Sequence, residues 1–434
     1  MKEINFGVGF VTGRANVCQV INNYYKDMLR QTEKFSARAR LTIFIAYDTQ
    51  YQHTPRRDFY KISGECSARV HIVYITPSMV AREKRKLMDI LPVKAEDLKL
   101  LFGNGHAQGR NIVMYYALKY KMDYLLFWDD DEYPVACIKK HNGLVWLGQD
   151  NIFRHMAAMK YADVSVGYHC GYISPIPCFS FSYGLTEAAL KRFIGAIGNE
   201  IVNWNNIRDK MQNTNGVTFA DPAVIKDNSA REIQAVSGAK WVAGSTLCLN
   251  LRQARKLPVF YNPPQARGED TFFSLGLKNL KVVRVPAYHF HDGFLTCQQI
   301  MHRSYPQRLA KIQMDKARIK KRFFHAVLGW LRYKPLFIYL TNRRSFDLII
   351  RETAMNLERS RPGMAAVFGP SEFDCLSQTF AQYSMAVGRH YQEYISANRV
   401  WNMIRQYLMS GPTGKDLGSI RPTNNGGESS ESVG

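Results

Sequence analysis

The chain has 434 residues and a mass of 49.8 kDa, which exceeds one average domain and predicts either two units or one large unit with an appendage. Hydrophobic residues make up 46% of the sequence and charged residues 22%, a composition that excludes a wholly disordered chain. No stretch approaches about 18 uninterrupted apolar residues, so we expect no transmembrane helix. The N-terminus lacks a signal-peptide pattern, and we therefore expect a cytoplasmic protein.

Basic side chains are in excess and unevenly distributed. Lysine and arginine number 58 against 36 aspartates and glutamates, which gives a net charge of +22 and predicts an anionic partner. Half of this excess lies in residues 302–361, where 15 basic and four acidic side chains give +11. An anionic membrane surface, a phosphorylated substrate and nucleic acid would each suit such a segment. We favour an anionic acceptor, or peripheral docking on the inner face of a membrane through residues 302–361, over nucleic acid.

The cysteines give no sign of a metal site or a disulfide framework. The chain contains eight cysteines, none arranged as Cys-x-x-Cys and none in a Cys/His cluster with zinc-finger spacing. In the absence of an export signal we expect reduced and mostly buried thiols.

In chain order, short apolar runs alternate with helix-length segments over the first 300 residues. Strand-like runs cover 4–11, 41–47, 70–75, 124–128 and 162–168, and helix patterns cover roughly 16–32 and a segment from 109. This alternation is typical of parallel βαβ units. Because ligands bind beyond the carboxyl ends of the strands in such sheets, we expect the polar residues after these runs to line one crevice.

The composition changes beyond residue 298. Residues 299–361 are basic and helix-compatible and include an apolar and aromatic patch at 330–339, and a less charged helical stretch covers about 372–409. We therefore expect a helical basic C-terminal region over 299–409. Residues 410–434 contain few hydrophobic side chains, which predicts a disordered tail.

Three aspartates and a glutamate, residues 129–132, follow the strand at 124–128. Carboxylates this close repel one another, and in a packed site each raises the pKa of its neighbours. A divalent cation removes the conflict, because carboxylate oxygens are natural ligands of Mg²⁺ and Mn²⁺. The alternative is a solvated acidic turn, but the hydrophobic strand leading into the acids favours a Mn²⁺ or Mg²⁺ site at the crevice.

Tyr124–Glu132 resembles the strand and Asp-x-Asp motif of GT-A-fold glycosyltransferases, particularly the glycosyltransferase family 2-like group. Upstream, Gly109-Arg110-Asn111 resembles the Arg-Asn helix start that precedes this motif in the family. The resemblance covers roughly residues 3–295. It implies a GT-A domain over 1–298, a Rossmann-like and mostly parallel sheet flanked by helices, with a nucleotide-sugar half at about 1–135 and an acceptor half at about 136–298.

The resemblance further implies a site for a UDP- or GDP-sugar donor. The implied donor-binding residues are Thr12, Gly13, Arg14, Asp48, Arg110, Asn111, Asp129 and Asp130. Within this set, Asp48 is similar to the acid that binds the base, and Arg110 supplies bidentate donors to phosphate near a helix N-terminus. Asp129 and Asp131 are implied to hold the metal that bridges the diphosphate. In several GT-A enzymes a late histidine completes the metal shell or contacts the diphosphate, and His291, or alternatively His289, would do so here.

On the acceptor side, Arg267–Leu277 looks like the Glu-Asp segment that opens a helix in this family. An acid there takes the proton from the acceptor hydroxyl in inverting members, which implies Asp270 as the general base, with Glu269 as the alternative. Lys240–Thr246, including Trp241 and Gly244, resembles the small-residue strand beneath the acceptor.

These patterns predict a metal-dependent glycosyltransferase that moves a sugar from a nucleotide-diphosphate sugar to a hydroxyl of a glycan or lipid-linked acceptor. We expect direct displacement with inversion, although the fold hosts both stereochemical outcomes. Two alternatives stay open: a sugar nucleotidyltransferase and a non-catalytic basic nucleic-acid-binding protein. Against the first, the loop after the first strand has no clear glycine-rich signature beyond Gly13-Arg14, and against the second, no recognised nucleic-acid module is present.

Overall fold

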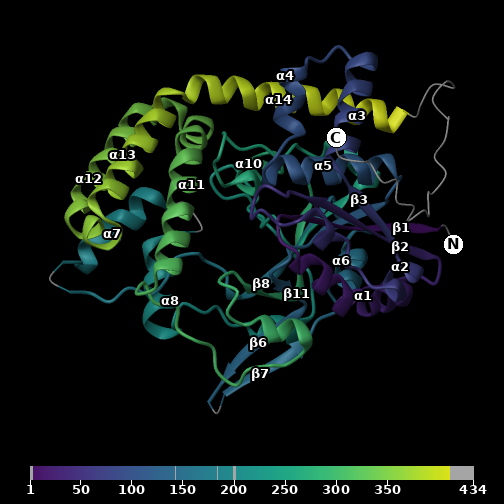
Figure 1. Ribbon diagram of the computed structural model, residues 1–434, viewed down its shortest axis with the longest axis horizontal. Helices are drawn as coiled ribbons and strands as arrows, with labels where there is room; N and C mark the ends of the chain where they lie inside the picture. The colour runs from purple at the N-terminus through teal and green to yellow at the C-terminus, as the bar shows by residue number, and fades with distance from the viewer. Residues whose placement is uncertain (1–2, 142, 183, 199–201, 411–434) are drawn as a thin grey trace, which may run out of the picture.

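The computed structural model describes residues 3–141, 143–182, 184–198 and 202–410. A mixed sheet flanked by helices occupies one part of the molecule, and helices from the C-terminal quarter of the chain form the other (Figure 1). The disorder predicted for 410–434 falls outside the described residues, apart from Ser410, which ends the last helix. Among the described residues, no helix combines the length and apolarity needed to cross a membrane.

The first half of the sheet is parallel, as predicted. Its strands are β1 (Ile4–Thr12), β2 (Ala39–Tyr47), β3 (His71–Ile75) and β4 (Tyr124–Phe127). β1 pairs in parallel with both β2 and β4, and β2 pairs in parallel with β3. The spatial order β3-β2-β1-β4 therefore reverses direction between β1 and β4. Such a reversal point opens a crevice at the carboxyl ends of the two strands.

The second half of the sheet corrects the prediction of a mostly parallel sheet. Its strands are β5 (Glu132–Tyr133), β8 (Val164–Tyr172), β9 (Arg231–Glu232), β10 (Leu247–Asn250) and β11 (Val282–Asp292). β10 runs antiparallel between β4 and β8, and β5 and β9 run antiparallel to β11, whereas β8 and β11 are parallel. The sheet is mixed because β10 follows an extended loop and inserts between two strands that run the other way.

Helices cover both faces of the sheet. Their bounds are α1 Asn16–Phe35, α2 Gly64–Arg69, α3 Pro77–Ile90, α4 Ala95–Leu101, α5 His106–Lys119, α6 Asn151–Ala158, α7 Glu187–Ile197, α8 Trp204–Asn213, α9 Pro222–Asp227 and α10 Glu269–Leu275. Side chains alternate along each strand, so Phe6, Val8 and Phe10 of β1 face α1 and α6 in one core. Gly9 faces α5, where a Cβ would lie 2.4 Å from Val113 Cγ1, so glycine here serves close helix packing.

A two-stranded hairpin lies outside the main sheet. β6 (Val135–Lys140) and β7 (Gly143–Gly148) pair with each other in antiparallel fashion. The hairpin projects from the sheet part of the molecule (Figure 1). Trp146 anchors it, because its Nε1 donates a 2.9 Å hydrogen bond to the carbonyl of Pro306.

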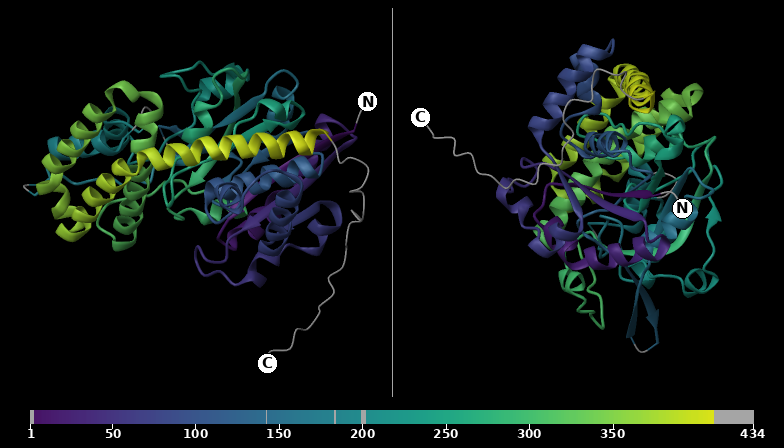
Figure 2. Two further views of the ribbon diagram at one scale, coloured as in Figure 1. Left: turned by 90° about the horizontal axis from the view of Figure 1, so that it is seen from above. Right: turned by 90° about the vertical axis from the view of Figure 1, so that its right-hand side faces the viewer.

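The C-terminal region is helical from residue 317. Its helices are α11 (Ala317–Thr341), α12 (Phe346–Phe368), α13 (Pro370–Met385) and α14 (Val387–Ser410). The first three pack with α7 around a core that includes Phe193, Phe323 and Phe368. α14 then runs back along the sheet part of the molecule (Figure 2). The region is not separate from the α/β part, because Tyr333 and Trp401 belong to the same core as the α5 face of the sheet.

Candidate functional site

The carboxyl ends of β1 and β4 meet, as the reversal of strand order requires. Thr12 Oγ1 donates a hydrogen bond to Asp130 Oδ2. Arg14 Nη2 lies 2.7 Å from Asp130 Oδ1 and 3.0 Å from Asp131 Oδ2. Asp48, after β2, joins the same edge through its backbone N–H, which donates to the carbonyl of Thr12 at 2.8 Å. The predicted crevice residues from three strand ends are therefore neighbours in space.

The acidic turn, residues 129–132, contains two aspartates whose surroundings shift their pKa values in opposite directions. Burial raises the pKa of Asp130 to about 7, although the charge of Arg14 acts against this rise. Burial also acts to raise the pKa of Asp131, but Arg14 and His291 outweigh it and hold that pKa below its usual value. Asp131 is therefore the acid in this pair that stays ionised at neutral pH.

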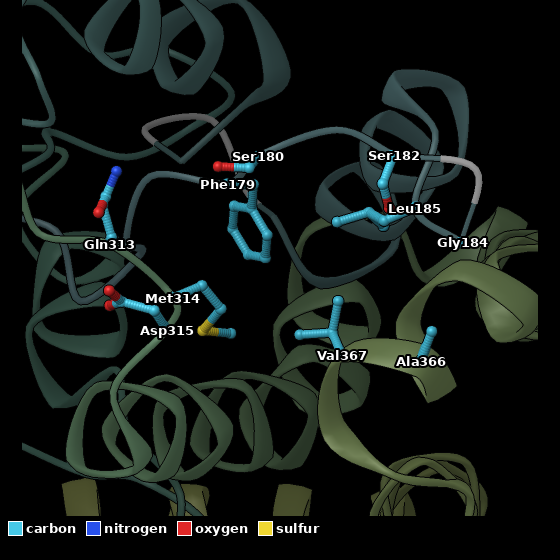
Figure 3. A pocket seen from close by; sticks show the side chains of 10 residues that line it. All are labelled: Phe179, Ser180, Ser182, Gly184, Leu185, Gln313, Met314, Asp315, Ala366 and Val367. Atoms are coloured by element: carbon cyan, nitrogen blue, oxygen red, sulfur yellow. The ribbon is translucent and has the colours of Figure 1, made fainter.

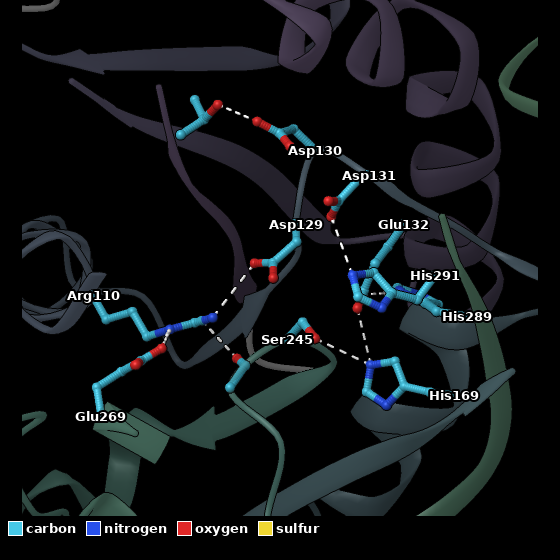
Figure 4. Close-up of polar contacts among 12 residues, drawn as sticks. Arg110, Asp129, Asp130, Asp131, Glu132, His169, Ser245, Glu269, His289 and His291 are labelled. Atoms are coloured by element: carbon cyan, nitrogen blue, oxygen red, sulfur yellow. Dashed lines mark hydrogen bonds and ion pairs between the residues drawn. The ribbon is translucent and has the colours of Figure 1, made fainter. Parts of the chain in front are cut away.

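Arg110 joins the acidic turn to Glu269 and to the loop at Gly244 (Figure 4). Its side chain is buried, with Nη2 3.4 Å from Asp129 Oδ1 and Nε 3.5 Å from Glu269 Oε1. Nη1 donates a 2.6 Å hydrogen bond to the carbonyl of Gly244. A Cβ on Gly244 would lie 2.8 Å from Arg110 Nη2, so glycine allows this approach.

The helix that carries Arg110 begins earlier than the sequence predicts. α5 starts at His106, directly after Gly105, whose φ is +120°. Arg110 consequently lies in the second turn of the helix, and the predicted position at a helix N-terminus is wrong. Its guanidinium reaches the acidic turn through the length of the side chain.

Glu269 and Asp270 stand in the first turn of α10, where the sequence placed a helix start. Burial and the neighbouring charge of Glu269 raise the pKa of Asp270 to about 6. Burial acts in the same direction on Glu269, but the charges of His106 and Arg110 hold the pKa of Glu269 below its usual value. Two adjacent carboxyl groups with separated pKa values are suited to different tasks, and a base with a pKa near neutrality transfers protons efficiently.

The two histidines of β11 lie on one face, as predicted, but their surroundings differ. His291 Nε2 lies 3.6 Å from Asp131 Oδ1. His289 is fully buried, and its Nδ1 lies 3.0 Å from Glu132 Oε2. Of the two, His291 is the one that borders the three aspartates.

His169 is a site residue that no sequence pattern indicated. His169 lies opposite His289 in the parallel pairing of β8 and β11, and its Nε2 is 3.0 Å from Glu132 Oε1. Burial acts to lower the pKa of His169, but Glu132 outweighs it and raises that pKa. The predicted strand ends at residue 168, four residues before the end of β8 at Tyr172, so no pattern assigned His169 to the sheet. Glu132 is thereby fixed by two histidines.

Tyr51 is a second residue that the sequence did not single out. Its ring lies over Gly13, where a Cβ would be 2.5 Å from Tyr51 Cβ, and 62% of the tyrosine is exposed. The only sequence signal is its position three residues after Asp48.

Two predicted binding residues, Asn111 and Trp241, make their contacts outside the acidic turn. Asn111 is buried, and its side chain donates to the carbonyl of Phe260 at 2.8 Å and accepts from the Phe260 N–H at 3.0 Å. Trp241 packs against Phe337 of α11, with ring centroids 5.8 Å apart. The strand expected over 240–246 is also absent, because this segment is an extended loop that ends in a turn with Thr246 at φ +56°.

Asp131 and His291, two of the three residues proposed for the metal, fit a site that substrate oxygens would complete. Within the described ranges, no three His, Cys, Asp or Glu side chains are grouped so as to hold a metal ion. Asp131 and His291 do lie together, whereas Asp129 is turned toward Arg110. Mg²⁺ is commonly bound by one or two carboxylates together with substrate phosphates. The donor set here is consistent with that manner of binding.

A pocket of about 300 Å³ lies in the helical part of the molecule (Figure 3). Its lining residues are Phe179, Ser180, Ser182, Gly184, Leu185, Gln313, Met314, Asp315, Ala366 and Val367. None of them belongs to the acidic turn or contacts it, so the pocket is not the crevice described above.

No protein-family model matches the chain, and no curated protein matches it in sequence. Its fold and site define an α/β protein with paired acids, arginines and histidines at the reversal point of a mixed sheet.

Proposed function

We propose that the protein is a metal-dependent glycosyltransferase of the GT-A fold, which moves a sugar from a UDP- or GDP-sugar to a hydroxyl of a glycan or lipid-linked acceptor. The observation that carries the proposal is the position of Arg110. A single buried guanidinium contacts Asp129 on one side and Glu269 on the other, so the donor-side acids border the same space as Glu269, the neighbour in sequence of the candidate base Asp270.

On the donor side, the loops after β1 and β2 supply the nucleotide pocket. Asp48 is available for the base or ribose, and the exposed ring of Tyr51 offers a stacking surface. Asp131 and His291 would hold Mn²⁺ or Mg²⁺ together with diphosphate oxygens. A divalent cation bound there neutralises negative charge on the diphosphate.

The reaction in this proposal is a single displacement. Asp270 takes the proton of the acceptor hydroxyl, whose oxygen forms a bond to the anomeric carbon as the bond from that carbon to the diphosphate oxygen breaks. The electron pair of the broken bond leaves with the nucleoside diphosphate. A pKa of about 6 leaves Asp270 ionised, and able to accept the proton, at neutral pH. Arg110 keeps Glu269 and the loop at Gly244 in place beside it.

The charge of the C-terminal region bears on the kind of acceptor in this proposal. Residues 302–361 carry a net charge of +11, which favours an acceptor with anionic groups or docking of the enzyme on an anionic membrane leaflet. Both uses place the acceptor on the side of the site that faces the C-terminal helices.

A donor-hydrolysis screen tests the proposal. The full chain is incubated with a panel of nucleotide sugars in Mn²⁺, Mg²⁺ or EDTA, and the released nucleotide is identified. We expect metal-dependent release of a nucleoside diphosphate from one donor, abolished by Asp131→Ala and retained by Asp347→Ala, a matched change at an exposed acid on α12. Release of pyrophosphate from a nucleoside triphosphate incubated with a sugar 1-phosphate would indicate a nucleotidyltransferase instead. Absence of both release and metal-dependent donor binding would refute the glycosyltransferase proposal.

A further inference from the structure

The basic C-terminal region contributes a side chain to the site. Arg322 lies in the second turn of α11, beside the turn that follows β11. A Cβ built on Gly293 would be 3.0 Å from His291 Cε1 and 3.3 Å from Arg322 Nη2. The guanidinium of Arg322 and the ring of His291 therefore approach the same point from two different parts of the chain.

Two contacts hold Arg322 in this position. Its guanidinium carbon lies 5.2 Å from the ring centroid of Phe294, which presents a flat face to the guanidinium plane. One turn earlier on α11, Arg318 Nη2 donates a 2.8 Å hydrogen bond to the carbonyl of Phe294. The turn after β11 is thus fastened to α11, and the direction of the Arg322 side chain follows from this docking.

The charge of Arg322 is poorly compensated. Its Nε is buried without a hydrogen-bond partner among the described residues, and no ion pair within 4.0 Å joins it to a described carboxylate. Burial lowers the pKa of Arg322, Asp131 acts against this, and Arg267 and Arg14 add to the lowering. Arg14 and Arg110, by contrast, each contact carboxylates directly. A half-buried guanidinium on which the charges of Arg267 and Arg14 also act favours an anion as its missing partner.

We propose that Arg322, together with Arg14, forms a phosphate-binding subsite next to Asp131 and His291. The inference rests on the proposed function for the origin of the phosphate, which is either the diphosphate of the donor or a phosphate group on the acceptor. The guanidinium fork matches two phosphate oxygens, and a partly desolvated position makes such a bond stronger than one at the surface. Arg322 is in this view a substrate-binding residue supplied by the C-terminal region.

The segment leading to Arg322 is suited to guide an anion there. Residues 303–322 contain eight basic side chains and one acidic side chain, a net charge of +7. Several of them, including Lys316, Arg318 and Lys321, are exposed. A run of one charge sign at the edge of a site raises the local concentration of the opposite charge. Half-burial beside His291 distinguishes Arg322 from its exposed neighbour Lys321, which makes the two residues a matched pair for a test.

The test compares Arg322→Gln, Arg322→Lys and the control Lys321→Gln in the full chain, with folding checked by thermal melting. Calorimetric titration with inorganic pyrophosphate in Mg²⁺ measures the subsite without a donor sugar. We expect Arg322→Gln to weaken pyrophosphate binding about 10- to 100-fold, the usual effect of losing a hydrogen bond to a charged group. Arg322→Lys should recover part of the affinity, and Lys321→Gln should bind like the wild type.

Two further titrations separate the sources of the phosphate. If it belongs to the donor, Arg322→Gln loses affinity for UDP or GDP as it does for pyrophosphate, while affinity for the nucleoside monophosphate changes little. If it belongs to the acceptor, the variant keeps its nucleoside diphosphate affinity and loses binding of inorganic phosphate to the UDP- or GDP-saturated protein. Equal binding by Arg322→Gln and Lys321→Gln in all these titrations overturns the subsite. Arg322-dependent pyrophosphate binding without hydrolysis of any donor would leave the subsite standing and refute the proposed function alone.

Discussion

Replacing Arg110 by methionine removes the guanidinium that lies between Asp129 and Glu269. Methionine keeps much of the length and apolar volume of the side chain but loses the charge and every hydrogen-bond donor. The variant leaves two carboxylates without their cation and the carbonyl of Gly244 without the donor now 2.6 Å away. Stability should therefore fall even in the absence of any substrate.

The size of this loss follows from the contacts. Two opposite charges separated by about 3.5 Å attract by about 5 kcal/mol at an effective dielectric constant of about 20. The cost of burying the guanidinium offsets several kcal/mol of the attraction, and the Asp129 side chain, at 33% exposure, regains hydration when its partner is lost. Breaking a buried ion pair by removing one partner costs about 3–5 kcal/mol. We expect Arg110→Met to lower the free energy of unfolding by about 3 kcal/mol, at the lower end of this range.

The matched control is Arg252→Met. Arg252 Nε lies 2.7 Å from Asp123 Oδ1, and its guanidinium lies 5.1 Å from the ring centroid of Tyr124, but the side chain is 39% exposed. Exposed ion pairs contribute about 0–1 kcal/mol. Urea unfolding followed by tryptophan fluorescence at neutral pH measures both variants against the wild type. If Arg110→Met unfolds at the same urea concentration as Arg252→Met, the argument from a buried, shared guanidinium is refuted.

Three further predictions concern Asp270 and the cysteines. Asp270→Asn should keep donor binding while turnover falls about 10²- to 10⁴-fold, as expected for loss of a general base, and near-wild-type turnover would exclude Asp270 from that role. Because only the ionised carboxylate accepts a proton, and the pKa of Asp270 is raised to about 6, wild-type turnover should rise with pH through about 6; a profile that is flat across this range would contradict the assignment. A thiol reagent should react rapidly with Cys375, which is exposed, and slowly with the seven buried cysteines; rapid reaction of a second thiol would contradict their burial.

The sequence predicted the parallel half of the sheet because the signals there are local. Each of β1 to β4 is an apolar run that ends at a polar residue, and the strand bounds differ from the predicted ones by only one or two residues. Parallel strands with helical crossovers place their carboxyl ends at one edge, so the meeting of Thr12, Arg14 and the acidic turn could be anticipated. The expected burial of the cysteines is confirmed for all but Cys375.

The features that could not be predicted depend on contacts between residues far apart in the chain, which local sequence patterns do not encode. β10 has four residues and takes its direction from β4 and β8 rather than from its own sequence. Asn111 is satisfied by the backbone of Phe260, 149 positions along the chain. Arg322 reads as one more basic residue of an amphipathic stretch until the docking of α11 places it beside His291.

The fold is complete only when α14 has packed against the sheet part of the molecule. Val400, Trp401 and Ile404 of α14 share a core with Leu98 and Leu101 of α4, and Arg405 donates to the carbonyl of Leu257 at 2.5 Å. Since a ribosome releases the chain from its N-terminus, the sheet emerges long before the helix that covers this core. The nascent chain must therefore expose apolar surface until α14 has been synthesised. A premature stop ahead of residue 387 would yield an aggregation-prone chain rather than a smaller folded protein.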